Sequence, residues 1–288
     1  MIRSFLFVPG DSERKLARAG DSGADALILD LEDAVAADAR AGAREITRDF
    51  VAGRTDTWVR INPLDGPDAA ADLEAVVPAG PAGIVLPKAS SADDVDALAA
   101  RLDALEKDHG LDPGGTAILP LVTERPAALF SLGSYAGGRP RLAGMTWGAE
   151  DLAAAIGAAH NRDAEGRWLP PYELARSLCL FAAAAAGVAA VDTVFTDYRD
   201  LDGLADYAAM ARRDGFFGML AIHPAQVEVI NPAFTPTPGE LDRARRIVDL
   251  FASHPGAGVL GLEGRMLDRP HLLQAERLLA LAARLDNE

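Results

Sequence analysis

Short apolar segments alternate with helical patterns along most of the chain. Eight apolar runs precede residue 225, and most of them end in a turn signal or a polar cluster. Runs of this kind are typical of parallel strands buried on both faces, and the patterns between them predict crossover helices. The predicted strands cover residues 4–10, 26–33, 58–63, 83–88, 117–124, 142–146, 191–195 and 218–224.

Eight strand–helix units favour a closed barrel over an open doubly wound sheet. We therefore predict an α/β fold, a (β/α)8 TIM barrel, with its catalytic domain over residues 1–230. No GxGxxG or Walker pattern opens a predicted helix, which disfavours a nucleotide-binding fold. The tail differs in pattern, with a proline-rich linker, a helix at about 240–253, a glycine-rich stretch and a last helix from about Pro270. We predict a C-terminal helical lid extension over residues 231–288.

Composition limits the classes of function. The chain has 288 residues and is 49% hydrophobic, which is enough for a large core. Its net charge of -15 argues against nucleic acid as a partner, although anionic small ligands remain possible through local basic groups. No apolar run approaches the ~20 residues that span a bilayer, and the N-terminus lacks a signal-peptide pattern. We expect a cytoplasmic protein with no membrane partner. The single cysteine, Cys179, lies in an apolar run and is expected to be buried and inert.

Polar residues follow nearly every predicted strand. In a (β/α)8 barrel the carboxyl ends of the strands share one face, and that face carries the active site. The accumulation of charged groups there is therefore more informative than any one of them. The residues at these ends are Asp30, Glu32, Asp33, Arg60, Asn62, Lys88, Glu124, Glu150, Asp151, Asp197 and His223.

Charge considerations suggest roles for three of these residues. Carboxylates crowded into a cleft repel one another unless they are protonated or bound to a cation. Ligation by oxygen alone favours Mg²⁺ or Mn²⁺, with water and substrate completing the coordination. Glu124 and Asp151 follow neighbouring strands and form the natural pair of metal ligands. Arg60 is a fixed cation suited to a substrate carboxylate or a developing oxyanion.

Structural alternatives exist for each of these residues. Asp151 also suits the start of a helix, and Glu124 can cap the helix that Pro126 begins. Arg60 can be an ion-pair partner of the acids that follow the second strand. Lys88 is better explained as an ion-pair partner than as a Schiff-base lysine. His223 suits a structural hydrogen bond, and Trp147 is predicted to form a wall of the pocket.

Several motifs occur in an order that matches a known family. The chain resembles the citrate lyase β-subunit-like CoA ester lyases of the HpcH/HpaI aldolase superfamily, over nearly its whole length. The two most specific elements are Leu29-Asp30-Leu31-Glu32-Asp33 and Gly148-Ala149-Glu150-Asp151-Leu152. The others are Phe7-Val8-Pro9-Gly10-Asp11-Ser12, Val59-Arg60-Ile61-Asn62, Leu86-Pro87-Lys88, Thr123-Glu124 and Ala221-Ile222-His223-Pro224-Ala225-Gln226-Val227.

The resemblance implies a Mg²⁺-dependent lyase that cleaves or forms a carbon–carbon bond in a β-hydroxyacyl-CoA. Candidate substrates are malyl-, citramalyl- and citryl-CoA, and the products would be an oxo acid and a short acyl-CoA. The resemblance also implies a homotrimer or hexamer in which an acid from the lid of one subunit covers a neighbouring active site. Here Asp268 is nominated for that acid.

Carried over to this chain, the resemblance gives a set of predicted site residues. Glu124 and Asp151 are the metal ligands, and the order Thr123-Glu124-Arg125-Pro126 departs from the Glu-Thr-Ala-Arg common in relatives. The basic residues Arg14, Lys15 and Arg18 suit either CoA phosphates or a solvated helix face. The predicted catalytic residues are Arg60, Glu124 and Asp268. The predicted substrate-binding residues are Arg60, Glu124, Asp30, Glu32, Asp33, Lys88 and Trp147.

Three other hypotheses remain open from the sequence. One is a subunit of a citrate lyase complex that acts on citryl-acyl-carrier protein. Another is a Schiff-base aldolase that uses Lys88. The third is a non-catalytic barrel that keeps the fold as a scaffold, although the intact set of Arg60, Glu124 and Asp151 argues against it.

Overall fold

The structure, a computed structural model, describes residues 2–285. The described chain forms two compact units, residues 2–233 and residues 234–285, and each is treated separately below. No helix in the described part of the chain is both long and apolar enough to cross a membrane.

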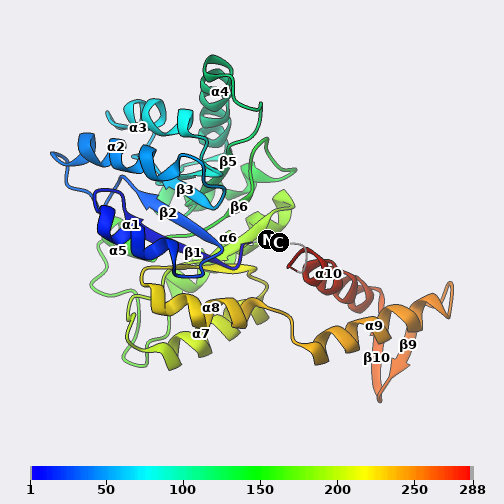
Figure 1. The fold of residues 1–288 in the computed structure, drawn as a ribbon. Helices are drawn as coiled ribbons and strands as arrows, with labels where there is room; N and C mark the ends of the chain where they lie inside the picture. The colour runs from blue at the N-terminus through cyan, green and yellow to red at the C-terminus, as the bar shows by residue number, and fades with distance from the viewer. Residues whose placement is uncertain (1, 286–288) are drawn as a thin grey trace. The chain divides into compact units, whose positions relative to one another are not determined.

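The first unit is built on eight parallel strands (Figure 1). Their order in the sheet is β5-β4-β3-β2-β1-β8-β7-β6. The bridges Ile118–Leu142 and Leu121–Thr146 join the segments of β5 and β6, the first and last strands in this order. The prediction of a (β/α)8 barrel is therefore confirmed. The strands are β1 (Ser4–Pro9), β2 (Ala26–Asp30), β3 (Thr57–Arg60), β4 (Gly83–Leu86), β5 (Ala117–Pro120), β6 (Gly144–Met145), β7 (Ala189–Asp192) and β8 (Gly218–Ala221).

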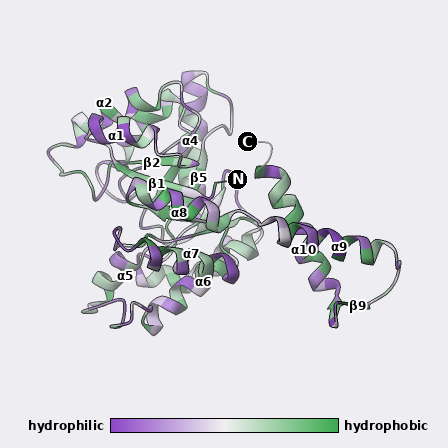
Figure 2. Ribbon diagram, turned by 60° about the horizontal axis from the view of Figure 1, so that its bottom comes forward, coloured by the Kyte–Doolittle hydropathy of each residue, from purple (hydrophilic) through white to green (hydrophobic). Residues whose placement is uncertain are grey.

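Helices follow the strands and surround them. Figure 2 shows hydrophobic residues along the strands, while the outer helices also carry hydrophilic residues. Short 3₁₀ helices occupy Val77–Ala79, Pro126–Phe130 and Leu132–Tyr135. The α-helices are α1 (Glu13–Gly20), α2 (Arg40–Val51), α3 (Ala69–Val76), α4 (Ala92–His109), α5 (Ala149–Ile156), α6 (Pro170–Ala186), α7 (Leu201–Asp214) and α8 (Pro224–Phe234).

Side chains from most of the strands fill the inside of the barrel. Phe5, Ile28, Val85 and Leu220 belong to one buried cluster with Trp58. The Trp58 ring lies over Gly83 on the next strand, where an added Cβ would come within 2.3 Å of ring carbons. A glycine is therefore required at this point of the barrel wall. Cys179 is fully buried as predicted, and burial raises the pKa of its thiol.

All eight strands end one to four residues before the predicted end, and the third, sixth and seventh also begin at other residues than predicted. The sixth strand is Gly144–Met145 rather than residues 142–146, because its flanking residues pair with β5 only through isolated bridges. The seventh begins earlier than predicted, at Ala189, and ends at Asp192, before the apolar residues Val194 and Phe195. Apolar character alone therefore marked these strands without marking their ends.

The second unit contains α9 (Pro238–Ala252), the strands β9 (Val259–Leu262) and β10 (Arg265–Asp268), and α10 (Arg269–Leu285). A capping box between Thr237 and Glu240 begins α9. A small core that includes Ala244, Ile247 and Leu267 joins the helices to the hairpin. The sequence indicated the two helices, but the antiparallel hairpin lies where only a glycine-rich stretch was recognised.

Candidate active site

The carboxyl ends of the strands surround a cavity of about 420 Å³ in the first unit. Asp30 and Arg60 are the last residues of β2 and β3, and Asp151 lies in the first turn of α5, after β6. Most of the predicted site residues line this cavity. Glu32 and Lys88 do not line it, but they form ion pairs with each other and with residues that do. The predicted residues that line it are Asp30, Asp33, Arg60, Glu124, Trp147, Glu150 and Asp151.

Arg60 is held by a carboxylate on the neighbouring strand. Its Nε and Nη2 donate to the two oxygens of Asp30 at 2.7 and 2.6 Å, and Nη1 lies 3.2 Å from Glu32 Oε2. The Arg60 side chain is only 12% exposed. Burial alone would lower the pKa of Arg60, but the hydrogen bonds and charge of Asp30 outweigh it and raise the pKa. The guanidinium is therefore a rigid, permanent cation at the cavity.

Lys88 connects three acidic groups. Its ammonium forms an ion pair with Glu32 and lies 3.3 Å from Asp151 Oδ1, and 3.7 Å from Asp33 Oδ2. Burial would lower the pKa of Lys88, but the hydrogen bond to Glu32 and the nearby carboxylates raise it instead. A Schiff-base lysine needs a neutral amine, so this environment disfavours nucleophilic catalysis by Lys88.

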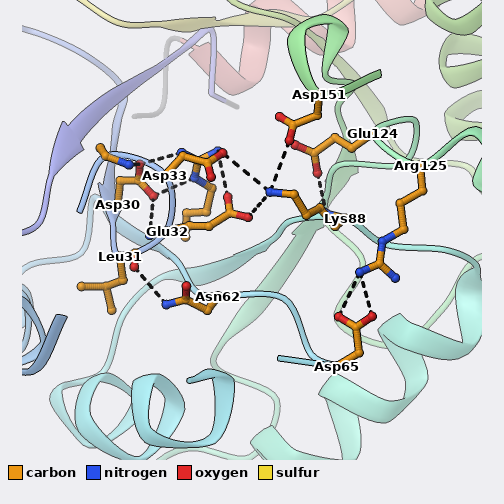
Figure 3. Close-up of polar contacts among 12 residues, drawn as sticks. Asp30, Leu31, Glu32, Asp33, Asn62, Asp65, Lys88, Glu124, Arg125 and Asp151 are labelled. Carbon is orange, nitrogen blue, oxygen red and sulfur yellow. Dashed lines mark hydrogen bonds and ion pairs between the residues drawn. The ribbon is translucent and has the colours of Figure 1, made fainter. Parts of the chain in front are cut away.

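The backbone of Lys88 also takes part in the site. Its φ of 53° lies in the left-handed region, which residues other than glycine seldom adopt. In this conformation the Lys88 amide donates to Glu124 Oε2 (Figure 3). Lys88 therefore contacts Glu124 through its backbone and Asp151 through its ammonium.

Glu124 is a buried carboxylate whose two oxygens differ in their hydrogen bonding. The residue is 2% exposed, and no hydrogen-bond partner for Oε1 exists among the described residues. Burial, and then the charge of Asp151, raises the pKa of Glu124 to about 8. The short helix that follows has Arg125 at its N-cap and no side-chain cap, so the capping role considered for Glu124 is wrong. An unpaired buried oxygen is costly unless a ligand satisfies it.

The position of Asp151 suits both roles considered for it, the helix-start acid and the metal ligand. It lies in the first turn of α5, where a negative charge is favourable, and its side chain is 31% exposed toward the cavity. In the described part of the chain no group of three or more His, Cys, Asp or Glu side chains is arranged to hold a metal. A cation bound by Glu124 and Asp151 would therefore need water and substrate oxygens as further ligands. Mg²⁺ characteristically binds in this way, and the unpaired Glu124 oxygen fits it.

Trp147 lines the cavity, and its side chain is anchored by Asp192 at the end of β7. The residue is fully buried, and its Nε1 donates to Asp192 Oδ1 at 2.7 Å. Asp192, also fully buried, accepts further hydrogen bonds from Arg176 and Tyr207. Asp192 and Arg176 were not among the residues predicted from the sequence to belong to the site. Asp192 carried a detectable signal, since it is an acid inside an apolar run, but its partner on α6 had none.

Three other strand-end residues do not line the cavity. Asp197 is exposed, and exposed His223 stacks on Tyr198 with ring centroids 5.0 Å apart. Asn62 is buried and hydrogen-bonds Leu31 and Asp72, which is a structural role.

Two groups of predicted residues lie elsewhere. Asp268 belongs to the second unit, where its Oδ1 lies 2.5 Å from His271 Nδ1. Arg14, Lys15 and Arg18 are exposed on α1, so both explanations of them remain.

The fold and the cavity together define a class: a (β/α)8-barrel enzyme with an acidic site at the carboxyl ends of its strands. The chain belongs to the HpcH/HpaI aldolase/citrate lyase family, whose model matches residues 3–224.

Curated relatives resemble the chain over almost its whole length. A (3S)-malyl-CoA thioesterase from Cereibacter sphaeroides (strain KD131 / KCTC 12085) is 35% identical, covering 98% of this chain and 94% of the relative. The citrate lyase subunit beta of Leuconostoc mesenteroides subsp. cremoris is 34% identical, with 97% and 93% covered. A crystal structure of the protein CitE from Mycobacterium tuberculosis, in complex with magnesium, acetoacetate and coenzyme A, is also similar. Its TM-score is 0.81 at 35% identity, and the match covers 98% of each chain.

Proposed function

We propose that the protein is a Mg²⁺-dependent carbon–carbon lyase that acts on a short β-hydroxyacyl-CoA. The observation that carries the proposal is the pair Glu124 and Asp151 at the cavity, beside a rigid Arg60. One Glu124 oxygen has no hydrogen-bond partner among the described residues. Family membership and the similar CitE complex with magnesium and coenzyme A support it.

Glu124 and Asp151 would hold the cation. Bound Mg²⁺ would act as a Lewis acid that lowers the pKa of a substrate hydroxyl and orients the bond to be cleaved. Glu124 is suited to this position because Lys88 already fixes its other oxygen through the backbone. Asp151 keeps part of its carboxylate open to the cavity.

Arg60 would stabilise the charge that appears during cleavage. When the substrate hydroxyl loses its proton, the carbon–carbon bond breaks and its electron pair moves into a thioester enolate. A cation already held by Asp30 and Glu32 requires little reorganisation to stabilise that charge. The enolate carbon then takes up one proton, which balances the proton lost from the hydroxyl, and the oxo acid and the acyl-CoA leave.

Asp268 would supply the proton to the enolate carbon, or remove it in the direction of synthesis. In the second unit its carboxylate is partly exposed and lies against His271, an arrangement that suits proton exchange. The assignment follows the resemblance, in which the lid acid of one subunit serves a neighbouring active site. It therefore includes a homotrimer or hexamer, which sedimentation of the purified protein would test.

The substrate is best tested with a panel of malyl-, methylmalyl-, citramalyl- and citryl-CoA in Mg²⁺, with products identified by mass. Formation of an oxo acid together with a shorter acyl-CoA supports the lyase. Release of free CoA with the hydroxy acid intact would instead indicate thioester hydrolysis, an activity for which the C. sphaeroides relative is named. Absence of turnover across the panel would favour a non-catalytic barrel.

Citryl-acyl-carrier protein is the main alternative substrate, because relatives include citrate lyase β subunits. Its thioester is the same, so the cation site and Arg60 would act in the same way. Cleavage of citryl-acyl-carrier protein at a higher kcat/KM than citryl-CoA would establish it.

Borohydride trapping separates the proposal from a Schiff-base aldolase. The ion pair between Lys88 and Glu32 leads us to expect no covalent adduct in the presence of substrate, and complete loss of turnover in EDTA.

A further inference from the structure

The two proposed ligands lie on opposite sides of the seam between β5 and β6. Glu124 follows β5 and Asp151 follows β6, a strand of only two residues. Isolated bridges take the place of a continuous ladder between these strands. In the described residues, the last backbone hydrogen bond across this seam runs from the Val122 amide to the Thr146 carbonyl, at 2.9 Å.

Beyond that point a side chain continues the connection. The Thr123 hydroxyl oxygen accepts a hydrogen bond from the Gly148 amide at 3.2 Å, and it faces the Gly148 carbonyl oxygen at 3.5 Å. Thr123 is fully buried and directly precedes Glu124. Gly148 is the N-cap residue of α5, whose first turn carries Asp151. One hydroxyl therefore ties the backbone that carries one ligand to the backbone that carries the other.

The segments that Thr123 joins approach each other very closely. A Cβ added at Gly148 would lie 2.7 Å from Glu124 Cγ and 3.2 Å from its Oε1. The Glu124 side chain therefore packs against the bare backbone of Gly148, and a small movement of that backbone would displace the carboxylate.

We propose that Thr123 is a positioning residue for the cation site, because its hydroxyl fixes the separation between Glu124 and Asp151. It acts through the backbone of Gly148 and does not contact the substrate. The inference rests on the proposed function for the identity of the cation, Mg²⁺. Supporting groups of this kind commonly change metal affinity by about 10- to 100-fold when removed.

The same seam provides a matched control. Thr146 is also fully buried, and its hydroxyl oxygen has no hydrogen-bond partner among the described residues. Thr123→Val and Thr146→Val thus make the same chemical change within a few residues of each other along the seam, and only the first removes a hydrogen bond. Thr123→Ser keeps the hydroxyl and removes the methyl group, so it serves as the rescue variant.

The test combines two measurements on the full-length protein. Hydrogen exchange of the Gly148 amide, followed by NMR in EDTA, reports the hydrogen bond without any metal. Calorimetric titration with Mg²⁺ reports the cation site. We expect Thr123→Val to speed exchange at Gly148 and weaken Mg²⁺ affinity about tenfold. Thr146→Val and Thr123→Ser should stay within about twofold of wild type, allowing for ordinary variation between conservative variants.

Each contrary outcome has a distinct meaning. Unchanged exchange at Gly148 in Thr123→Val would overturn the connection itself. Faster exchange with unchanged Mg²⁺ affinity would overturn the positioning role, and so would an equal loss of affinity in Thr146→Val. If wild-type protein takes up no Mg²⁺ at all, the proposed function fails together with the role inferred for Thr123, whereas the exchange measurement still reports the hydrogen bond.

Discussion

Glu124 shows how a residue placed to bind a cation, as proposed here, can oppose folding. Its pKa is raised to about 8 by burial and by the charge of Asp151, well above the ordinary value of 4.5. The metal-free folded state therefore binds a proton more tightly than the unfolded chain does. Stability from this proton is fully present below pH 4.5 and is lost as the pH rises through 8.

Glu124→Gln should remove this dependence. In EDTA, the free energy of unfolding of the wild type should fall between pH 6 and 9, because the buried carboxylate must ionise. The variant should show a flatter profile over the same range, because its amide does not titrate. Urea unfolding at several pH values measures both. Parallel profiles for the two proteins would contradict the raised pKa.

The affinity for Mg²⁺ should depend on pH for the same reason. A proton on Glu124 must leave before the carboxylate can bind a cation. We expect the apparent affinity to weaken about tenfold per pH unit below 8 and to level off above it. Titration calorimetry between pH 6 and 9 checks this, and an affinity independent of pH would show that Glu124 is already ionised without the metal.

The pairing of individual residues was the least predictable part of the site. The sequence identified the charged residues at the strand ends, because the carboxyl ends of barrel strands share a face. It could not show that Arg60 pairs bidentately with Asp30, since this depends on the register of β2 and β3. Neither the left-handed backbone of Lys88 nor the hydroxyl contact of Thr123 leaves a trace in residue type.

At the scale of elements, Gly148 joins β6 to α5 where no side chain fits. Gly148→Ala should displace Glu124, because the new methyl group would overlap its Cγ. We expect turnover to fall at least tenfold and unfolding to become easier by about 1–3 kcal/mol, the usual cost of overpacking.

Gly42 provides the control for that substitution. It lies within α2, and nothing lies within 4 Å of a Cβ added there. Gly42→Ala should leave turnover unchanged and stabilise the protein by up to ~1 kcal/mol, through helix propensity. Thermal unfolding and steady-state kinetics of both variants make the comparison. Wild-type turnover in Gly148→Ala would show that the close contact with Glu124 is unimportant.

Most of the elements were predictable from sequence, and the exceptions have physical causes. The eight barrel strands are buried on both faces, so their apolar runs stand out. β9 and β10 are four residues each and are mostly exposed or half-buried, which gives a weak signal. Their turn contains Glu263 and Gly264, both with positive φ, a pattern typical of tight hairpins but easily taken for a flexible loop.

At the scale of the whole molecule, the proposed chemistry draws on both compact units. Asp268→Asn should reduce turnover by at least 100-fold, because the amide cannot exchange a proton with the enolate carbon. Mg²⁺ affinity should stay at the wild-type level, since both proposed ligands belong to residues 2–233. Wild-type turnover in Asp268→Asn would exclude the role proposed for it.

Above all, we propose that the Glu124–Asp151 site cleaves a carbon–carbon bond with the help of Mg²⁺. The most direct measurement follows the products of malyl-CoA by mass, with Mg²⁺, with EDTA, and after Mg²⁺ is restored. We predict glyoxylate and acetyl-CoA with Mg²⁺, none in EDTA, and recovery on restoration. Cleavage that persists in EDTA, or hydrolysis to malate and free CoA with no acetyl-CoA formed, would contradict it.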